Sequence, residues 1–158
     1  MAITPFATEA DWRMAIDTTL IYAHHELRLF DGDMQRIALE DVERIARLSA
    51  FLAADPDRRL RLVLIELDYL QRHCPRLLGL MRRCGHAIET RQCPAHLRHL
   101  AERYLLADGQ HGAIRFHTDQ PRGKLVLDEG GEIQPWWRRF DDLWLESEAV
   151  APASTLGL

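Results

Sequence analysis

The chain has 158 residues, of which 47% are hydrophobic and 28% charged, and its formal net charge is −4. This length fits one domain of about 100–200 residues, and the composition excludes a disordered chain. The negative charge gives no overall attraction toward phosphate backbones, so the composition does not support a nucleic-acid partner, although it does not exclude one.

The sequence carries no feature of a membrane or secreted protein. No apolar run approaches the roughly 18 residues that cross a bilayer, and the opening residues, MAITPFATEADW, lack the pattern of a secretory signal. Lys124 is the only lysine among the basic residues, and this preference for arginine indicates a GC-rich bacterial genome. We therefore expect a bacterial, cytoplasmic protein that does not associate with membranes.

The first third of the chain predicts a helix, a strand and a second helix. Thr8 can cap the first helix, in which apolar residues recur at three- and four-residue steps until His24-His25. Glu26–Asp31 alternates apolar and polar residues, as strands do, and a turn-forming Asp-Gly-Asp stretch closes it. The apolar stripe over Leu39–Leu52 predicts a helix that ends before Pro56.

The middle of the chain predicts the centre of a sheet. Leu60–Ile65 consists almost entirely of hydrophobic residues, which is typical of a parallel strand covered on both faces. Pro75 fits the first turn of the next helix, and Gly85 fits its end. Ala87–Arg91 follows and indicates a third strand.

The last part predicts a hairpin, another strand and a closing helix. Pro94 opens a short helix, and Ala101–Gly109, AERYLLADG, is then typical of a strand that enters a tight turn. Ala113–His117 is the predicted partner strand of that hairpin, and Lys124–Asp128 is a further strand. The closing helix is expected to begin near Gln134-Pro135 and to bury one aromatic face.

This order of elements predicts one α/β domain whose mixed sheet is flanked by helices on both faces. Residues 1–148 form the predicted domain. The remaining residues, 149–158, are small, proline-containing and weakly patterned, which indicates a flexible C-terminal tail.

A resemblance to a known superfamily rests on four stretches: Leu27–Asp31, Leu60–Glu66, Tyr104–Gly109 and Arg139–Trp144. With the order of elements around them, these stretches make the chain resemble the phospholipase D-like superfamily. More narrowly, the chain is similar to a proteobacterial branch whose domain is often attached to an N-acetyltransferase domain. The resemblance implies a single-domain phospholipase D-like sheet and an acetyltransferase as a candidate partner.

The same resemblance shows where a catalytic residue is missing. Active members carry His-x-Lys followed, after four residues, by Asp. If Asp108 is the acidic position, the lysine position falls on Arg103 and the histidine position on Ala101. The family reaction passes through a covalent phosphohistidine, and alanine has no lone pair with which to attack phosphorus. Active members need two such motifs, from one chain or a dimer, so a homodimer is a second candidate partner.

We therefore predict a non-catalytic binding or regulatory module of unidentified ligand, without a cofactor or metal. Its ligand site is expected around Arg103, Asp108 and Arg115, because a guanidinium offers forked donors to phosphate or carboxylate. The alternative is a phosphodiesterase or nuclease that uses a non-standard histidine, with His111 and His117 as the candidates.

A zinc site is a further alternative. Cys84, Cys93, His96 and His99 offer the thiol and imidazole ligands that zinc accepts, but only Cys93 and His96 have the usual ligand spacing. The simpler interpretation is that the cysteines fill core space and the histidines lie exposed on a turn and a short helix.

Two other charged groups have structural explanations. Glu66 and Asp68 follow the buried strand at the edge where open α/β sheets bind ligands, and could form a carboxylate pair. We favour Asp68 as a cap of the next turn. A basic patch near the third helix is expected to be a solvated or protein-contact surface; it consists of Arg72, Arg76, Arg82 and Arg83.

Overall fold

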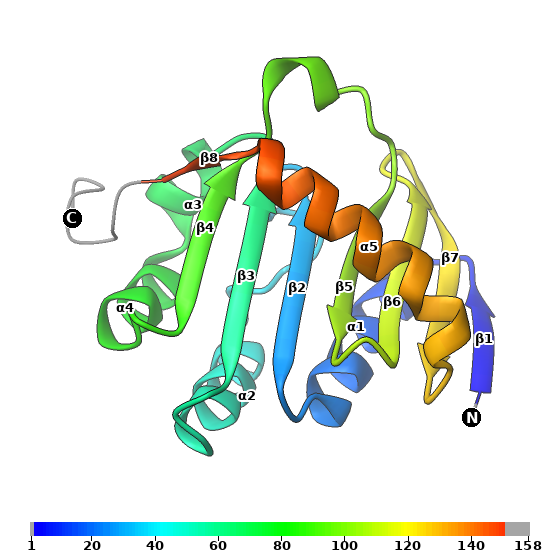
Figure 1. Ribbon diagram of the computed structural model, residues 1–158, viewed down its shortest axis with the longest axis horizontal. Coiled ribbons are helices and arrows are strands. Elements are labelled where there is room, and N and C mark those ends of the chain that lie inside the picture. The colour runs from blue at the N-terminus through cyan, green and yellow to red at the C-terminus, as the bar shows by residue number, and fades with distance from the viewer. Residues whose placement is uncertain (1, 151–158) are drawn as a thin grey trace.

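A mixed sheet of eight strands runs through the centre of the computed structural model, which describes residues 2–150 (Figure 1). The strands lie in the order β1-β7-β6-β5-β2-β3-β4-β8. Their bounds are β1 Ala2–Phe6, β2 Glu26–Asp31, β3 Arg59–Leu64, β4 Ile88–Gln92, β5 Arg103–Ala107, β6 His111–His117, β7 Gln120–Leu127 and β8 Glu148–Ala149.

The sheet changes direction at β2. On one side, β2, β3 and β4 are parallel; on the other, β5 pairs with β2 in the antiparallel sense, with Leu105 opposite Leu29. Strands β6, β7 and β1 continue the antiparallel part. As a result, the carboxyl ends of β2 and β3 lie at the same edge of the sheet as the amino end of β5.

Helices cover both faces of the sheet, so the predicted fold class is confirmed. In Figure 1, α5 crosses the front of the sheet, and α1, α2 and α4 lie behind it. The helices are α1 Glu9–Tyr22, α2 Val42–Ala53, α3 Asp68–His73, α4 Pro75–Arg83 and α5 Gly130–Glu146, with a short 3₁₀ helix, η1, at Ala95–Leu97.

Each face of the sheet has its own hydrophobic core. Leu29 of β2 packs in the core that α1, α2 and α4 share, whereas its neighbour Phe30 packs in the core under α5. Strand β3 also divides its side chains, with Leu62 in the first core and Val63 in the second. Because both faces are buried, this strand needs an apolar residue at nearly every position. The predicted central parallel strand is therefore confirmed.

The predicted helix starts are confirmed for α1 and α4. The side chain of Thr8 accepts a hydrogen bond of 3.0 Å from the N–H of Asp11, as an N-cap does. Pro75 begins α4, and Glu40 caps that helix from a distance, because its carboxylate accepts the N–H groups of Arg76 and Leu77 at 2.9 Å each.

The bounds of two predicted elements were wrong. Helix α5 begins at Gly130, before the predicted Gln134-Pro135, because the N–H of Ile133 bonds to the carbonyl of Glu129 and its side chain is buried in the core. Strand β7 begins at Gln120 rather than Lys124, because it continues the pairing with β6 to the hairpin turn.

Strands β1 and β8 and helix α3 were not predicted. The predicted tail at 149–158 lies mostly outside the described residues, but Ala149 pairs with Arg91, and the N–H of Val150 donates to the carbonyl of Thr90. None of the helices within residues 2–150 combines the length and the hydrophobicity that a bilayer crossing requires.

Candidate anion-binding pocket

A pocket of about 350 Å³ opens at the carboxyl ends of β2 and β3. This is the edge at which open α/β sheets bind ligands. Strand β2 lies there between β3, with which it is parallel, and β5, with which it is antiparallel. The loops after β2 and β3 are joined, because the carbonyl of Gly32 accepts the N–H groups of Ile65 and Glu66 at 3.0 and 2.9 Å. The lining residues are Asp31, Gly32, Asp33, Gln35, Arg36, Ile65, Glu66, Arg98, Arg103, Thr118 and Asp119.

Arg103, the first residue of β5, is a lining side chain that is only 6% exposed. Its Nη1 donates to the carbonyls of Leu100 and Glu102 at 2.7 Å each, and its guanidinium carbon lies 5.0 Å from the ring centre of Phe30. Its Nε is buried and has no hydrogen-bond partner among the described residues. Burial lowers the pKa of Arg103, and the nearby Asp31 opposes that change. The side chain is a cation whose Nε is a buried donor without a partner in the described protein.

Asp31 is the buried acid of the pocket. Its Oδ2 accepts the N–H of Met34 at 2.8 Å, and the residue is 6% exposed. Burial raises its pKa from 3.8 to about 6, even though the Met34 hydrogen bond and Arg103 lower it. The carboxyl group therefore changes its charge close to neutral pH, beside a guanidinium that does not.

Two exposed arginines lie at the rim of the pocket. Arg98 forms an ion pair with Glu66, and Arg36 donates to the carbonyl of Thr118 and lies 4.0 Å from Asp119. The first contact links the segment after η1 to the loop after β3, and the second links the loop after β2 to the turn after β6. Since the partners are exposed, these cations can turn toward a ligand at small cost.

Arg115 lies opposite Arg103 in the register of β5 and β6, but each of its three side-chain nitrogens donates a hydrogen bond within the protein. Its Nη1 and Nη2 bind the carboxylate of Glu9 at 2.6 and 3.0 Å, and it also donates to the carbonyls of His117 and Thr118. The hydrogen bonds from Arg115 lower the pKa of Glu9. Arg115 thus fixes the turn that carries one wall of the pocket.

Asp108, the third predicted site residue, is not brought to the pocket. It follows the last residue of β5, about 16 Å along the strand from Arg103. Its carboxylate accepts the N–H groups of His24, His25 and Glu26 at 2.8 Å each, and its φ is 59°. Asp108 ties the end of α1 to the β5–β6 turn, because a short acid tolerates this left-handed conformation and reaches the nearby backbone.

Neither candidate histidine lines the pocket. His111 is buried, and its Nδ1 accepts the N–H of Asp128 at 2.9 Å. His117 is exposed on the other end of β6, where its Nδ1 accepts the N–H of Asp119 at 3.1 Å. The backbone carbonyl of Ala101 accepts the N–H of Thr118 at 2.9 Å, so the residues before β5 are held to the β6–β7 turn.

The possible zinc ligands do not converge. Cys93 is buried in the core under α5, Cys84 ends α4, and His96 pairs with Glu146 at 3.1 Å. Within residues 2–150 there is no group of three or more histidine, cysteine, aspartate or glutamate side chains that could hold a metal ion.

Of the possible carboxylate pair, only Glu66 lines the pocket. The predicted cap by Asp68 was wrong: α3 begins at Asp68 itself, after Leu67, and no side chain makes the cap hydrogen bond. Asp31 was predicted only as a turn former. Its position as the last residue of a buried strand, at the carboxyl edge, was the signal that could have identified it.

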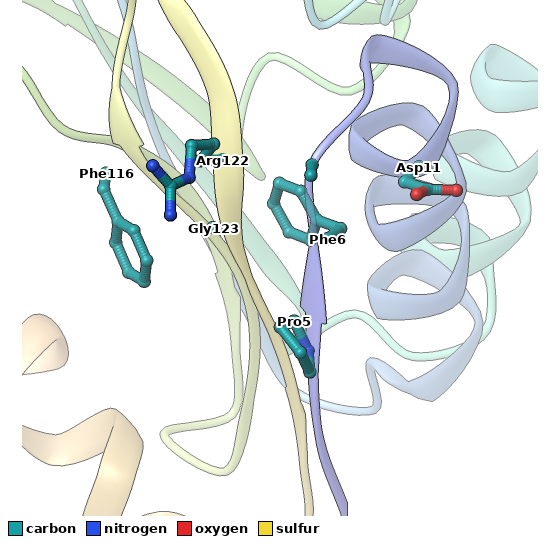
Figure 2. A pocket seen from close by; sticks show the side chains of 7 residues that line it. Pro5, Phe6, Asp11, Phe116, Arg122 and Gly123 are labelled. Carbon is teal, nitrogen blue, oxygen red and sulfur yellow. The ribbon is translucent and has the colours of Figure 1, made fainter.

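Another pocket, of about 420 Å³, lies near the edge of the sheet. Figure 2 shows that its side chains do not point toward a common centre: Phe6 lies beside α1, Asp11 points away from it, and Phe116 and Arg122 lie beyond the ribbon of β7. This pocket lacks a convergent set of polar groups, and the pocket at Arg103 is the stronger candidate.

Comparisons with solved structures describe the fold. TrmBL2, an archaeal chromatin protein with "a novel mode of DNA binding", matches with a TM-score of 0.66 and 13% identity over 95% of this chain and 55% of that chain. Nuc from Salmonella typhimurium, a phospholipase D family member, matches with a TM-score of 0.66 and 11% identity over 94% of this chain and 97% of its own. NucT from Helicobacter pylori matches with a TM-score of 0.58 and 8% identity over 94% and 99%.

These identities show the fold alone, and the chain spans little more than half the length of TrmBL2. The search of curated proteins gave no match. A family model does match, over residues 9–154. The chain therefore belongs to the family described as Domain of unknown function (DUF7931), and its fold is phospholipase D-like.

Proposed function

We propose that this domain is a non-catalytic binding module whose pocket holds an oxyanion, a phosphate, sulfate or carboxylate group, at Arg103. The observation that carries the proposal is the free Nε of Arg103, buried in a lined pocket without a partner. A buried donor without a partner costs about 1–3 kcal/mol, and an anion oxygen would offset that cost. Arg36 and Arg98 at the rim supply further donors.

The other predicted site residues have supporting roles in this proposal. Arg115 positions the turn beside the pocket, and Asp108 holds the far end of β5. The non-catalytic part is supported by Ala101, at the position where the resemblance implies the attacking histidine. It is also supported by the absence of His111 and His117 from the pocket lining in the described part of the chain.

Sulfate is a suitable probe for this proposal, because it is an oxyanion whose own charge does not change between pH 5 and pH 8. We expect chemical-shift changes in Arg103 and its neighbours when sulfate is titrated at constant ionic strength. Arg103→Met keeps the length of the buried side chain and should lower the affinity about tenfold. Arg47→Met, at an exposed position of α2, is the matched control and should leave the affinity unchanged. Equal affinities in the two variants would refute the proposal.

Hydrolysis of bis(4-nitrophenyl) phosphate tests the absence of catalysis. We expect no release of nitrophenol above the uncatalysed rate, even at high protein concentration. Hydrolysis that His111→Gln or His117→Gln abolishes would instead establish the phosphodiesterase or nuclease alternative.

The partner is a separate proposal. Resemblance to the branch attached to acetyltransferase domains supports an acetyltransferase, and the two-motif requirement of active relatives supports a second copy of this chain. Sedimentation equilibrium distinguishes them: a monomeric mass would exclude the homodimer.

A further inference from the structure

A cavity of about 460 Å³ lies on the other face of β5, between the carboxyl-terminal half of α5 and the segment that runs from the end of η1 to β5. It shares no lining residue with the pocket at Arg103, because successive side chains of β5 point to opposite faces of the sheet. Its lining residues are Leu97, Leu100, Glu102, Tyr104, Arg139, Asp142, Leu143 and Glu146.

Tyr104 places a free hydroxyl group in this cavity. The residue is 2% exposed, and its ring centre lies 5.7 Å from that of Phe30 and 5.6 Å from that of Trp136. Within residues 2–150 the hydroxyl has no hydrogen-bond partner. Burial raises the pKa of Tyr104, so the group stays neutral. Packed rings thus hold a polar atom whose partner is not supplied by the described protein.

The walls are apolar and the rim is negative. Leu97, Leu100 and Leu143 supply the apolar surface. The charged lining residues comprise three carboxylates and one guanidinium. The guanidinium carbon of Arg139 lies 4.6 Å from the ring centre of Trp136.

The carboxylates are largely available to a ligand. Glu146 has a contact of 3.1 Å with His96. The side-chain carboxylates of Glu102 and Asp142 have no ion-pair partner in the part of the chain that the structure describes. An anionic ligand would therefore meet net repulsion at this rim, and a cationic ligand net attraction.

We propose that this cavity binds a small organic amine: an apolar body lies against the leucines, and the ammonium group donates to the Tyr104 hydroxyl oxygen and to the carboxylates of Asp142 and Glu146. The apolar walls alone would accept many ligands, but the negative rim and the unpaired hydroxyl select a positively charged donor. This site differs in its lining and in the charge of its ligand from the proposed anion pocket.

Three probes of equal chain length separate the contributions: hexylamine, hexan-1-ol and hexanoate. We expect hexylamine to bind the whole chain most tightly, hexan-1-ol more weakly, and hexanoate at least tenfold more weakly than hexylamine. Amide chemical shifts of residues 97–104 and 139–146 report the binding. Failure of hexylamine to shift these residues, or hexanoate binding as tightly as hexylamine, would overturn the proposal.

Two variants test the named groups. Asp142→Asn combined with Glu146→Gln should lower hexylamine affinity about tenfold and leave hexan-1-ol affinity unchanged, and Tyr104→Phe should lower hexylamine affinity about threefold. Asp57→Asn, on an exposed loop, should have no effect on hexylamine affinity. Unchanged hexylamine affinity in the double variant would also overturn the proposal, provided that circular dichroism shows a folded chain.

Discussion

Three buried charged side chains differ in how fully the protein satisfies their hydrogen bonds, and this difference distinguishes a structural residue from a candidate binding residue. Arg115 has its guanidinium satisfied by Glu9 and two carbonyls, so its burial is compensated within the fold. Arg103 lies opposite it in register but keeps a free donor, and Asp31 is held partly protonated near neutral pH. The unpaired Nε of Arg103 and the raised pKa of Asp31 make their edge of the sheet the candidate site.

Asp31→Asn is expected to stabilise the protein above pH 7. The folded state raises the pKa of Asp31 from 3.8 to about 6, so the folded chain binds the proton more tightly than the unfolded chain. Stability from this residue is therefore greatest below pH 4, falls as the pH rises to about 6, and is constant above that. Removing the charge should add on the order of 3 kcal/mol at pH 8. Asparagine still accepts the N–H of Met34.

Urea unfolding at pH 4, 6 and 8 measures this effect. The variant should gain most at pH 8 and little at pH 4, whereas Asp57→Asn should follow the native protein throughout. A loss of stability at pH 8 in Asp31→Asn would show that the carboxylate is stabilised by its neighbours rather than destabilised by burial.

At the scale of helices and strands, the sequence was sufficient to predict an element whose residue pattern is contained within that element. The alternation in Glu26–Asp31 predicted β2 with its observed bounds, and Thr8 predicted the start of α1. Strand β1 could not be predicted in this way: it contains Pro5, and four of its five residues are exposed, so its conformation depends on pairing with β7. Likewise, β8 has two residues and exists through its pairing with β4.

Gly123→Ala tests that dependence on pairing. A Cβ at Gly123 would lie 1.9 Å from the carbonyl oxygen of Ile114 and 2.6 Å from the ring of Phe6, so β6 or β1 would have to move away from β7. We expect a loss of several kcal/mol in the free energy of unfolding, measured in urea. Gly131→Ala is the matched control, because nothing lies within 4 Å of its Cβ and alanine favours the helix; its stability should be unchanged or up to about 1 kcal/mol higher. Equal stabilities in both variants would contradict the observed register.

For the molecule as a whole, β5 contributes to the two proposed binding sites, which lie on opposite faces of one sheet. Arg103 faces the pocket with Asp31, and the next residue, Tyr104, faces the cavity under α5. Resemblance pointed to Arg103 because it occupies a position in a local motif. It could not indicate Asp31, which ends β2, Arg36, which lies in the loop after β2, or Arg98, which follows η1, since only the sheet topology brings these segments to Arg103.

The distribution of charge over the whole molecule predicts that it does not bind duplex DNA at physiological salt, in contrast to what is described for its structural neighbour TrmBL2. The net charge is −4, and Arg28, Arg44 and Arg115 are paired with carboxylates, which removes them from contact with phosphates. Fluorescence anisotropy with a duplex of about 30 base pairs should show no binding at about 150 mM salt. Binding that weakens steeply with salt would contradict this prediction. The double variant Arg82→Gln with Arg83→Gln, compared with Arg47→Gln as control, would then locate the contact. If only the double variant reduced DNA binding, the exposed end of α4 would be the DNA contact. A local cluster of cations would in that case outweigh the repulsion of the remaining surface.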